Sequence, residues 1–487
     1  MTGANDRAAV RGRVLSVASE CVGLIKTGGL ADVVGALPAA LAAQGWDMRV
    51  LLPAYRGLAA HLKDTREVWA ETDLYGGPAR VLAGRAAGLR VLLLDAPHLF
   101  DREGGPYSAH GADFPDNPER FAALSWVAAA IAREGTDDDW RPDILHAHDW
   151  QAGLAPAYLR YQGVSDVRSV LTIHNIAFQG IAASYKLSAL RLPHSEFHSG
   201  GFEYWGNISS LKAGLVTADR ITTVSPTYAD ELMRPEFGMG LEGVIASRAS
   251  DLEGLLNGVD EAVWDPANDP EIATYSARRP KGKAQNRAAL LEEFGLGEVP
   301  GPLAILVSRL TGQKGIDLVL AALPDFVAAG GALAVLGSGE PALEAALRDA
   351  EVRFPGRVAV RIGYDEGLSH RMFGGGDAVL VPSRFEPCGL TQMYGLRYGT
   401  IPVVAATGGL NDTVIGATPA SLAAGAATGI VFHPIDNLGL SQALRHLVQL
   451  HADEKEWARM RTRAMKTDVG WSSRSAAYAA LYESLLS

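Results

Sequence analysis

Ala378-Val-Leu-Val-Pro-Ser-Arg-Phe-Glu-Pro-Cys-Gly-Leu-Thr391 is the stretch of the sequence that decides the fold. Its first four residues form a short apolar run, which predicts a buried strand of a parallel sheet. A glycine turn at Cys388–Thr391 leads into a helical pattern, and a second apolar run follows at Ile401–Val404. Strand, turn, helix and strand in this order indicate a βαβ unit, so an α/β fold is expected.

One carboxylate, Glu386, stands at the carboxyl end of the first predicted strand, just before the predicted helix. Ligands of open α/β sheets bind at that edge, and the free amides of a helix N-terminus favour a phosphate. A lone glutamate in this position is also compatible with an acidic loop before a surface helix. The glycines beside Glu386 and the motifs at other strand ends favour a functional site.

Alternating strands and helical patterns recur in two series. Strands of the first series are predicted at Arg13–Glu20, Met48–Leu52, Leu89–Asp95, Ile144–Ala147, Ser169–Ile173 and Arg220–Val224. Those of the second are predicted at Leu303–Val307, Ala332–Leu336, Val358–Ile362, Ala378–Val381, Ile401–Ala405 and Ile430–Phe432. A turn-rich segment at residues 255–270 separates the series. A chain of 487 residues is also longer than a domain with a single hydrophobic core usually is. We therefore predict two doubly wound domains with a cleft between them.

Composition and charge exclude several classes of partner. The net charge of −11 argues against nucleic acid, because no broad basic face is expected. Two distant cysteines, Cys21 and Cys388, give neither a disulfide framework nor a metal-binding spacing, and they favour a reducing compartment. The N-terminal apolar run is too short for a signal peptide, and no apolar run approaches 18 residues. A cytoplasmic protein without a membrane partner is expected.

Two further turns combine glycine with cations. Lys26-Thr-Gly-Gly-Leu-Ala-Asp32 follows the first strand; Gly28 and Gly29 would let an anion approach the backbone, and Lys26 supplies positive charge. A plain helix-capping turn explains this motif equally well. Ser308-Arg-Leu-Thr-Gly-Gln-Lys-Gly315 follows the first strand of the second series. Its cations Arg309 and Lys314 could be incidental residues of a solvated loop, but their position at the end of a strand favours a diphosphate-binding role.

Histidines collect at the ends of two neighbouring strands. His146, His148, Asp149 and His174 are weakly metal-like in spacing, but they lack the spacing of a helix-borne pair and any cysteine. Hydrogen bonding to a polyhydroxylated substrate is the preferred interpretation, with at least one histidine serving only the structure. Tyr364 could stack on a base or pack within its loop, and Cys388 is interpreted as a small filler beside Glu386.

Together these motifs resemble the bacterial glycogen synthases. The resemblance runs from about Arg13 to the C-terminus and includes Lys26–Asp32, His146–Trp150, His174–Gly180, Leu211–Leu215, Thr223–Tyr228, Asn257–Asp260, Ser308–Gly315 and Pro382–Gly399. It implies the GT-B fold, with Rossmann-like domains at 1–257 on the acceptor side and 258–465 on the donor side. The C-terminal segment 466–487 would hold a helix that crosses back to the first domain.

The resemblance also implies an activity. Family members transfer glucose from a nucleotide sugar to the non-reducing-end 4-OH of an α-1,4-glucan such as glycogen, with retention of configuration. The bacterial and plant branch, which includes the starch synthases, uses ADP-glucose and needs no metal or other cofactor. Position 394 is a tyrosine, so the paired glutamates of many other retaining GT-B enzymes are absent, as in the glycogen synthase branch.

Site residues follow from the resemblance position by position. Catalytic roles are implied for Glu386, His174, Lys314, Arg309 and Asp149. Substrate-binding roles are implied for Lys26, Gly28, Gly29, Asp32, Tyr364, Cys388, Gly389, Leu390 and Thr391. Arg309 and Lys314 would neutralise the leaving ADP, Glu386 would meet the donor glucose, and Tyr364 would stack on adenine.

Two other functions remain open at this point. A phosphorylase with an internal phosphate cofactor would need a lysine that forms a Schiff base, and no lysine here has a matching context. A glucan-binding protein without activity could keep its aromatic residues but would not need Lys26, Arg309, Lys314 and Glu386, and all four are present.

Overall fold

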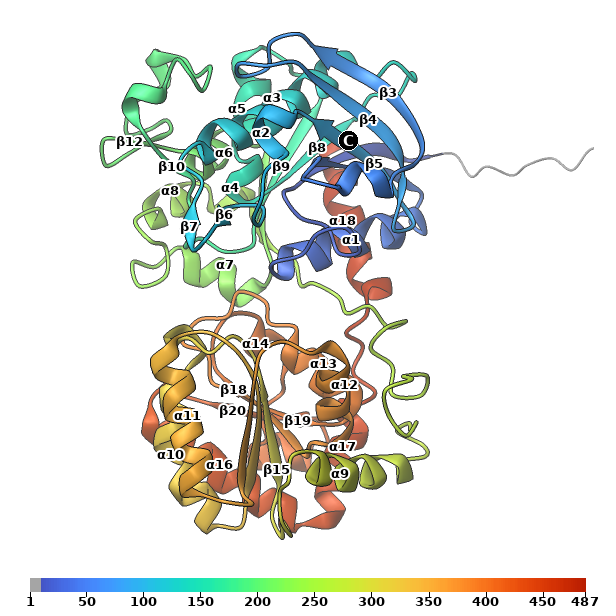
Figure 1. The fold of residues 1–487 in the computed structure, drawn as a ribbon, viewed down its shortest axis with the longest axis vertical. Helices are drawn as coiled ribbons and strands as arrows, with labels where there is room; N and C mark the ends of the chain where they lie inside the picture. Colours follow the sequence, from blue (N-terminus) through green and yellow to red (C-terminus); the bar gives the residue numbers. More distant parts are fainter. Residues whose placement is uncertain (1–9) are drawn as a thin grey trace, which may run out of the picture. The chain divides into compact units, whose positions relative to one another are not determined.

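The computed structural model describes residues 10–487, and what was predicted for residues 1–9 lies outside the described residues. Two compact units make up the chain (Figure 1). Of the described residues, the first includes 10–224, Ala229–Asn257 and Trp471–Ser487, and the second includes Ser225–Tyr228 and Gly258–Gly470. The chain therefore leaves the first unit after Asn257, and it returns at Trp471 rather than at residue 466.

A nine-stranded sheet forms the centre of the first unit. In spatial order its strands are β14 (Leu252–Gly254), β13 (Arg220–Thr223), β9 (Arg168–Ile173), β8 (Ile144–His148), β1 (Gly12–Val17), β2 (Trp46–Pro53), β5 (Leu89–Asp95), β4 (Ala79–Ala86) and β3 (Lys63–Glu71). The strands from β14 to β5 pair in parallel, whereas β4 pairs antiparallel with both β5 and β3.

Strands β3 and β4 were not predicted from the sequence. Most side chains of β3 are exposed, and the strand carries five charged residues among nine, so no apolar run marks it. Strand β4 lies between β3 and β5. Its side chains alternate between buried and less buried, which is the pattern of a sheet with one solvent-exposed face. Their pairing with β5 therefore depends on long-range contact rather than on a local signal.

Helices surround this sheet. Those of the first unit are α1 (Gly29–Ala42), α2 (Pro97–Phe100), α3 (Asn117–Glu134), α4 (Asp149–Ala152), α5 (Leu154–Tyr161), α6 (Ser210–Thr217), α8 (Glu242–Ser247) and α18 (Trp471–Leu486), while α7 (Pro226–Leu232) spans the boundary of the two units. A small sheet of β10 (Ile181–Ala183), β12 (Asn207–Ser209) and β11 (Glu203–Tyr204), and a pair of β6 (Ser108–Ala109) and β7 (Ala112–Asp113), complete the unit.

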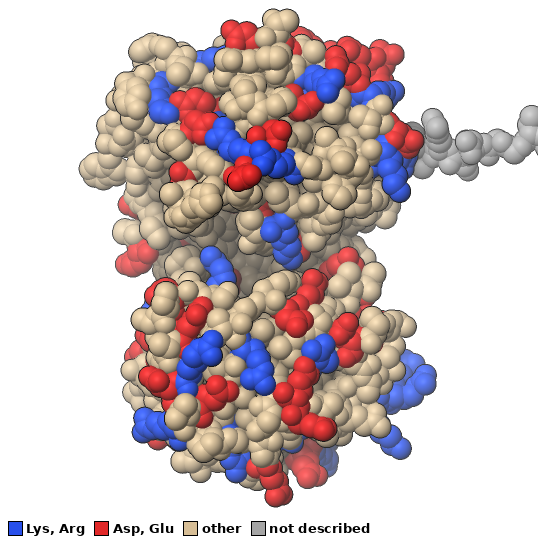
Figure 2. All heavy atoms as spheres, in the orientation of Figure 1, with Lys and Arg blue, Asp and Glu red and all other residues tan. Residues whose placement is uncertain are grey.

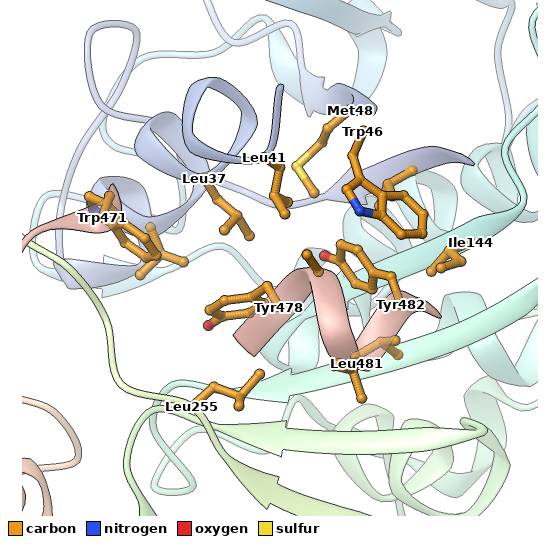
Figure 3. Close-up of a cluster of buried hydrophobic side chains, with 14 residues drawn as sticks. Leu37, Leu41, Trp46, Met48, Ile144, Leu255, Trp471, Tyr478, Leu481 and Tyr482 are labelled. Atoms are coloured by element: carbon orange, nitrogen blue, oxygen red, sulfur yellow. The ribbon is translucent and has the colours of Figure 1, made fainter. Parts of the chain in front are cut away.

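The C-terminal helix α18 is part of the first unit's core. Tyr478 and Tyr482 of α18 pack with Leu37 and Leu41 of α1 in one buried cluster, over Ile144 and other side chains of the sheet (Figure 3). The ring of Tyr482 meets Trp46 edge-on, with centroids 5.2 Å apart. Burying one such side chain stabilises a fold by about 1.5–3 kcal/mol, so α18 contributes substantially to this unit.

The second unit is built on a six-stranded parallel sheet. Its strands in spatial order are β17 (Val358–Ile362), β16 (Ala332–Gly337), β15 (Leu303–Val307), β18 (Ala378–Val381), β19 (Ile401–Ala405) and β20 (Ile430–Phe432). Its helices are α9 (Lys281–Glu293), α10 (Ile316–Ala328), α11 (Pro341–Arg353), α12 (Glu366–Gly375), α13 (Thr391–Tyr398), α14 (Gly408–Thr413), α15 (Pro419–Ala423), α16 (Asn437–Ala452) and α17 (Glu454–Ala464).

Both sheets reverse their strand order at one point. In the second unit the order is third, second, first, fourth, fifth, sixth, so the chain runs outward in opposite directions from β15 and β18. In the first unit the same reversal lies between β1 and β8. Ligands of doubly wound sheets bind beyond the carboxyl ends of the strands at such a point. The loops after β15, β18, β1 and β8 are therefore where a site is expected, and they carry the predicted motifs.

Candidate active site

Glu386 and Lys314 meet at the reversal point of the second unit. Lys314 lies in a single helical turn after β15, and its Nζ pairs with Oε2 of Glu386, which follows β18. Oε2 also accepts a hydrogen bond of 2.9 Å from Oγ of the buried Ser383. Both charged side chains are largely buried, so this carboxylate and this ammonium group are held in fixed positions.

Glycine is required where the neighbouring loops approach one another. Gly315 has a φ of +69°, and a Cβ built there would lie 2.1 Å from the carbonyl oxygen of Pro382. Gly408, which opens α14, has a φ of +44°, and its Cβ would lie 2.0 Å from the carbonyl oxygen of Glu386. The loops after β15, β18 and β19 thus pack backbone to backbone, which fixes the main chain on both sides of Glu386.

The side chain of Gln392 holds the turn that leads into α13. Gln392 is fully buried, and its Nε2 donates to the carbonyl oxygens of Cys388 and Gly389 at 3.1 and 2.7 Å and to Oγ1 of Thr413 at 3.0 Å. The carbonyl groups of this turn are therefore directed into the protein. The amides of Leu390 and Thr391, in the first turn of α13, are the type of donor that binds phosphate at a helix N-terminus.

Tyr394 has a packing role. Its ring stacks on that of Trp264, with centroids 3.8 Å apart and an angle of 12° between the planes. Tyr364, by contrast, is 78% exposed in the loop just after β17. Arg309 is exposed in the loop after β15, and Cys388 is buried beside Gly389.

Glu20 organises the glycine loop of the first unit, and sequence reasoning missed it. This buried carboxylate accepts hydrogen bonds from the backbone amides of Thr27 and Gly28, from Oγ1 of Thr27 at 2.6 Å and from the hydroxyl of Tyr107. Strand β1 ends at Val17 rather than at Glu20, so Glu20 belongs to the loop that it holds. An acidic residue directly after an apolar run and before a glycine turn was the available signal.

Open space surrounds the two glycines of that loop. A Cβ built on Gly28 or Gly29 would meet nothing within 4 Å, and neither glycine has a φ in the left-handed region. Neither glycine is thus explained by packing or backbone strain within the described residues. Lys26 is half-exposed beside them, and its Nζ lies 2.7 Å from Oδ1 of Asp32.

Asp149 and His174 lie at the ends of the adjacent strands β8 and β9. Oδ1 of Asp149 accepts hydrogen bonds from the backbone amides of His174 at 2.6 Å and Asn175 at 3.3 Å. Asp149 also has a φ of +54°, a left-handed conformation that costs about 1 kcal/mol or more and is concentrated at functional sites. Burial raises the pKa of the Asp149 carboxyl to about 7, and burial lowers the pKa of His174 to about 3. His174 is therefore neutral at physiological pH.

Two of the three histidines serve the structure. His146 is fully buried, and its Nδ1 and Nε2 bind the hydroxyl of Tyr482 at 2.7 Å and Oγ1 of Thr172 at 2.6 Å. His148 lies between Oγ of Ser16 at 3.1 Å and Nε2 of His174 at 3.0 Å. The preferred interpretation of these histidines as sugar ligands is therefore wrong for His146 and His148, because both nitrogens of each ring already have protein partners. His174 keeps Nδ1 as the atom through which it could contact a sugar.

Other classes of site were searched across residues 10–487. No group of three or more His, Cys, Asp or Glu side chains in that range is arranged to hold a metal ion. Within the same range, no helix is both long and apolar enough to cross a membrane. On the face drawn in Figure 2, Lys and Arg side chains are interspersed with Asp and Glu, so that face has no broad basic surface.

Comparison with known proteins places the chain among glycosyltransferases. The family model described as starch synthase catalytic domain matches residues 13–247, and the one described as glycosyl transferases group 1 matches residues 301–449. The catalytic domain of starch synthase IV from Arabidopsis thaliana, solved with ADP and acarbose, is similar with a TM-score of 0.86 and 31% identity, covering 97% of this chain and 99% of that chain. Sucrose-phosphate synthase from Thermosynechococcus elongatus shares the fold alone, with a TM-score of 0.62 and 19% identity over 98% of this chain and 99% of that chain. The predicted GT-B fold is confirmed.

Relatives in sequence extend over nearly the whole chain. The glycogen synthase of Cereibacter sphaeroides strain ATCC 17025 is 67% identical over 476 residues, which are 98% of this chain and 99% of the relative. That of Paracoccus denitrificans is 60% identical over 477 residues, covering 97% of this chain and 99% of the relative. At this identity and coverage, the chain belongs to the glycogen synthase family.

Proposed function

We propose that this protein elongates an α-1,4-glucan by transferring glucose from ADP-glucose to the non-reducing-end 4-OH, with retention of configuration. The observation that carries the proposal is the ion pair of Lys314 and Glu386 at the reversal point of the second sheet, beside the first turn of α13. The solved Arabidopsis relative holds ADP and acarbose, which supports a nucleotide-sugar donor and a glucan acceptor here.

The chemistry of transfer explains why cations are needed. ADP gains negative charge as it departs, while the sugar becomes cation-like, so fixed positive groups beside the phosphates lower the barrier. We assign this role to Lys314 and Arg309, with the amides of Gly389, Leu390 and Thr391 as further phosphate ligands and Cys388 within the same turn. Once Lys314 turns to the diphosphate, Glu386 is released to accept hydrogen bonds from the donor glucose.

The first unit supplies the remaining groups in this proposal. Lys26, Asp32 and the open backbone at Gly28 and Gly29 would form a second phosphate-binding loop, which Glu20 keeps in shape. Neutral His174 and Asp149 would hydrogen-bond the transferred sugar. In retaining transfer without a protein nucleophile, the acceptor attacks on the face that ADP leaves, and a departing phosphate oxygen takes the acceptor proton.

Donor choice is the most direct test. The exposed ring of Tyr364 would stack on adenine, which offers a larger face than uracil. We expect glucose incorporation into glycogen to be faster with ADP-glucose than with UDP-glucose when the two are compared at equal concentration. Equal or faster incorporation from UDP-glucose would contradict the assignment of the donor.

Metal independence is a separate prediction. The motifs offer no metal-binding spacing, and His146 and His148 use both ring nitrogens within the protein. Incorporation from ADP-glucose should therefore continue at an unchanged rate after dialysis against EDTA. A loss of activity that is restored by adding a divalent cation would show that the prediction is wrong.

A further inference from the structure

The first stretch of the second unit lies along one face of α13. We call residues 260–269, which come just after the start of this unit at Gly258, the strap. The ring of Trp264, in the middle of the strap, is sandwiched between two other rings. It stacks on His370 of α12 with centroids 4.0 Å apart and on Tyr394 of α13 with centroids 3.8 Å apart, and the planes are within 12° of parallel. Trp264 therefore joins the strap to both helices.

Arg397 of α13 makes a second connection to the strap. Its Nε donates a hydrogen bond of 3.2 Å to the carbonyl oxygen of Trp264. Its two terminal nitrogens lie 3.1 Å from Oε1 of Glu261 and 3.6 Å from Oδ1 of Asp265. One side chain of the helix thus binds three successive points of the strap.

Tyr398, the last residue of α13, is bound to the end of the strap. Its hydroxyl donates to Oδ2 of the buried Asp269, which also binds Nδ1 of His370 at 2.7 Å. Tyr394, Arg397 and Tyr398 have the spacing i, i+3 and i+4, which places them on one face of the helix. The strap covers this whole face.

The strap has a defined shape of its own. Asp260, Asp265 and Asp269 each accept a hydrogen bond on a side-chain oxygen from the backbone amide two residues further along, at 2.9, 3.2 and 2.9 Å. Turns closed by the side chain of an aspartate in this way fix the local backbone. The strap can therefore act as a support for the helix that it contacts.

Helix α13 depends on such support. It has eight residues, whereas isolated helices shorter than about 12–15 residues are marginal in water. Gly395, in its middle, weakens it further, but a Cβ there would lie 2.7 Å from the carbonyl oxygen of Thr400 and from the side chain of Val379. Gln392 shapes the turn before the helix, chiefly through carbonyl groups of that turn. The place of the helix beside the sheet is therefore set by contacts along the rest of its length.

We propose that Trp264 and Arg397 are positioning residues for glucose transfer. By holding α13 from the side, they place the amides of Leu390 and Thr391 against the donor diphosphate, and this inference rests on the proposed function. Tyr394 lies three residues after Thr391, about 4.5 Å along the helix axis, so a displacement of its ring moves these amides as well. A displacement of about 1 Å near a reacting group can lower a rate about 100-fold.

The test separates binding of the diphosphate from binding of the base in the full-length protein. The variants are Trp264→Leu, the conservative Trp264→Phe and Arg397→Met. The control is Trp457→Leu, which removes a tryptophan of similar burial from α17, where its ring meets His451. For each protein we measure the Kd of ADP by calorimetry, the KM for ADP-glucose and for glycogen, and the inhibition constants of inorganic diphosphate and of adenosine. The midpoint of thermal unfolding reports stability.

The expected result is a loss confined to the diphosphate. Trp264→Leu and Arg397→Met should raise the Kd of ADP, the KM for ADP-glucose and the inhibition constant of diphosphate by about tenfold, because displaced amides lose charge-assisted hydrogen bonds. The KM for glycogen and the inhibition constant of adenosine should stay within about twofold, as for sites that do not share contacts with α13. Trp264→Phe keeps a ring between the two neighbouring rings, so its Kd of ADP should be within about threefold of the wild type.

The control separates positioning from stability. Trp457→Leu should lower the unfolding midpoint by about as much as Trp264→Leu while leaving ADP binding unchanged. Weakened ADP binding in Trp457→Leu would overturn the proposal, because the loss would then follow stability alone.

Two further outcomes would overturn the positioning role. They are wild-type ADP affinity in a folded Trp264→Leu variant, and equal losses for adenosine and diphosphate. If Trp264→Leu does not fold, Arg397→Met gives the same test, since it leaves the stacked rings in place. A wild type that binds neither ADP nor diphosphate would overturn the proposed function itself, whereas unchanged affinities in variants of an ADP-binding protein overturn the positioning role alone.

Discussion

Glu386 and Lys314 neutralise each other in the absence of a ligand, so changing either one removes the partner of a largely buried charge. We expect Glu386→Gln to lower kcat by about 100-fold or more, because a preorganised electrostatic group is lost at the reacting sugar. The fold should survive, since glutamine can still accept the hydrogen bond from Ser383. The measurement is turnover with ADP-glucose, together with the midpoint of thermal unfolding.

A matched control is available in the same unit. Glu454 is exposed at the start of α17, and Glu454→Gln removes the same charge without changing the loops after β15 and β18. This variant should keep the wild-type turnover. If Glu386→Gln unfolds like the wild type and retains near-normal turnover, Glu386 is an acidic loop residue with no role in glucose transfer.

Asp149 gives the first unit a pH dependence whose sign can be derived. Burial raises the pKa of the Asp149 carboxyl from its usual value near 4 to about 7 in the folded protein. Between these values the folded state binds a proton that the unfolded state does not, so stability is lost as pH rises from about 4 to 7. Above pH 7 the contribution is constant, and the total is limited to about 4 kcal/mol.

The variant Asp149→Asn isolates this contribution. Asparagine keeps an acceptor for the amides of His174 and Asn175 but does not titrate. The unfolding free energy of the wild type, measured by urea denaturation, should therefore fall relative to that of Asp149→Asn between pH 4 and 7. A difference that stays constant over this range would contradict the raised pKa.

At the scale of elements, the C-terminal helix depends on a contact far along the chain. The hydroxyl of Tyr482 binds Nδ1 of His146, which is 336 residues away in sequence. Tyr482→Phe keeps the ring against Trp46 but leaves a buried histidine nitrogen without a partner, so it should cost about 1–3 kcal/mol. Urea unfolding measures the loss, and kcat should be unchanged because His146 is not proposed to touch substrate.

The ring itself makes a separate contribution. Tyr482→Leu removes the hydrogen bond and also creates a smaller, differently shaped side chain in the cluster of Figure 3, so it should destabilise the protein more than Tyr482→Phe. Equal stability of the wild type and Tyr482→Phe would mean that the link between Tyr482 and His146 has no net effect.

Elements with a strong local signal were predictable from the sequence. Strand β18 has the bounds that were predicted, because an apolar run between turns is visible in the sequence itself. Strand β3 was missed because its residues are mostly charged and exposed. Its position depends on pairing with β4, which no short window of sequence reveals.

The sequence predicted which loops surround the site but not how their side chains are oriented. The sequence indicated that His146, His148 and His174 lie at the ends of neighbouring strands, but it could not show which rings face the core. That depends on α18, which brings Tyr482 to His146, and on β1, which brings Ser16 to His148. The role of Glu20 was hidden for the same reason, since its partners Thr27, Gly28 and Tyr107 are found only in the fold.

At the scale of the whole molecule, the chain passes from the first unit to the second and back again. The second unit is continuous from Gly258 to Gly470 apart from Ser225–Tyr228. That short segment binds through Ser225 Oγ to the carbonyl oxygen of Pro387 at 2.7 Å and through Thr227 to Asp412. Water can replace these partners in an isolated fragment, so their loss should be tolerated.

We therefore expect residues 258–470 to fold without the rest of the chain, because the six-stranded sheet and its covering helices all lie within this range. The fragment also contains Arg309, Lys314 and the turn before α13, which are the groups proposed to bind ADP. It should unfold cooperatively, bind ADP in a calorimetric titration and transfer no glucose. Lys314→Ala in the fragment should weaken ADP binding by at least about tenfold, since a charge-assisted hydrogen bond contributes about 1.5–3 kcal/mol.

Residues 10–257 are expected to behave differently. Without α18, the apolar side chains of Leu37, Leu41, Trp46 and Met48 lose the helix that covers them. This fragment should aggregate, and a peptide of residues 471–487 added during refolding should restore a cooperative transition, because it replaces the missing layer of the core. A stable, soluble fragment 10–257 would mean that α18 is not needed for the fold of this unit. A cooperatively folded fragment 258–470 that fails to bind ADP would instead show that the donor depends on the first unit for its affinity.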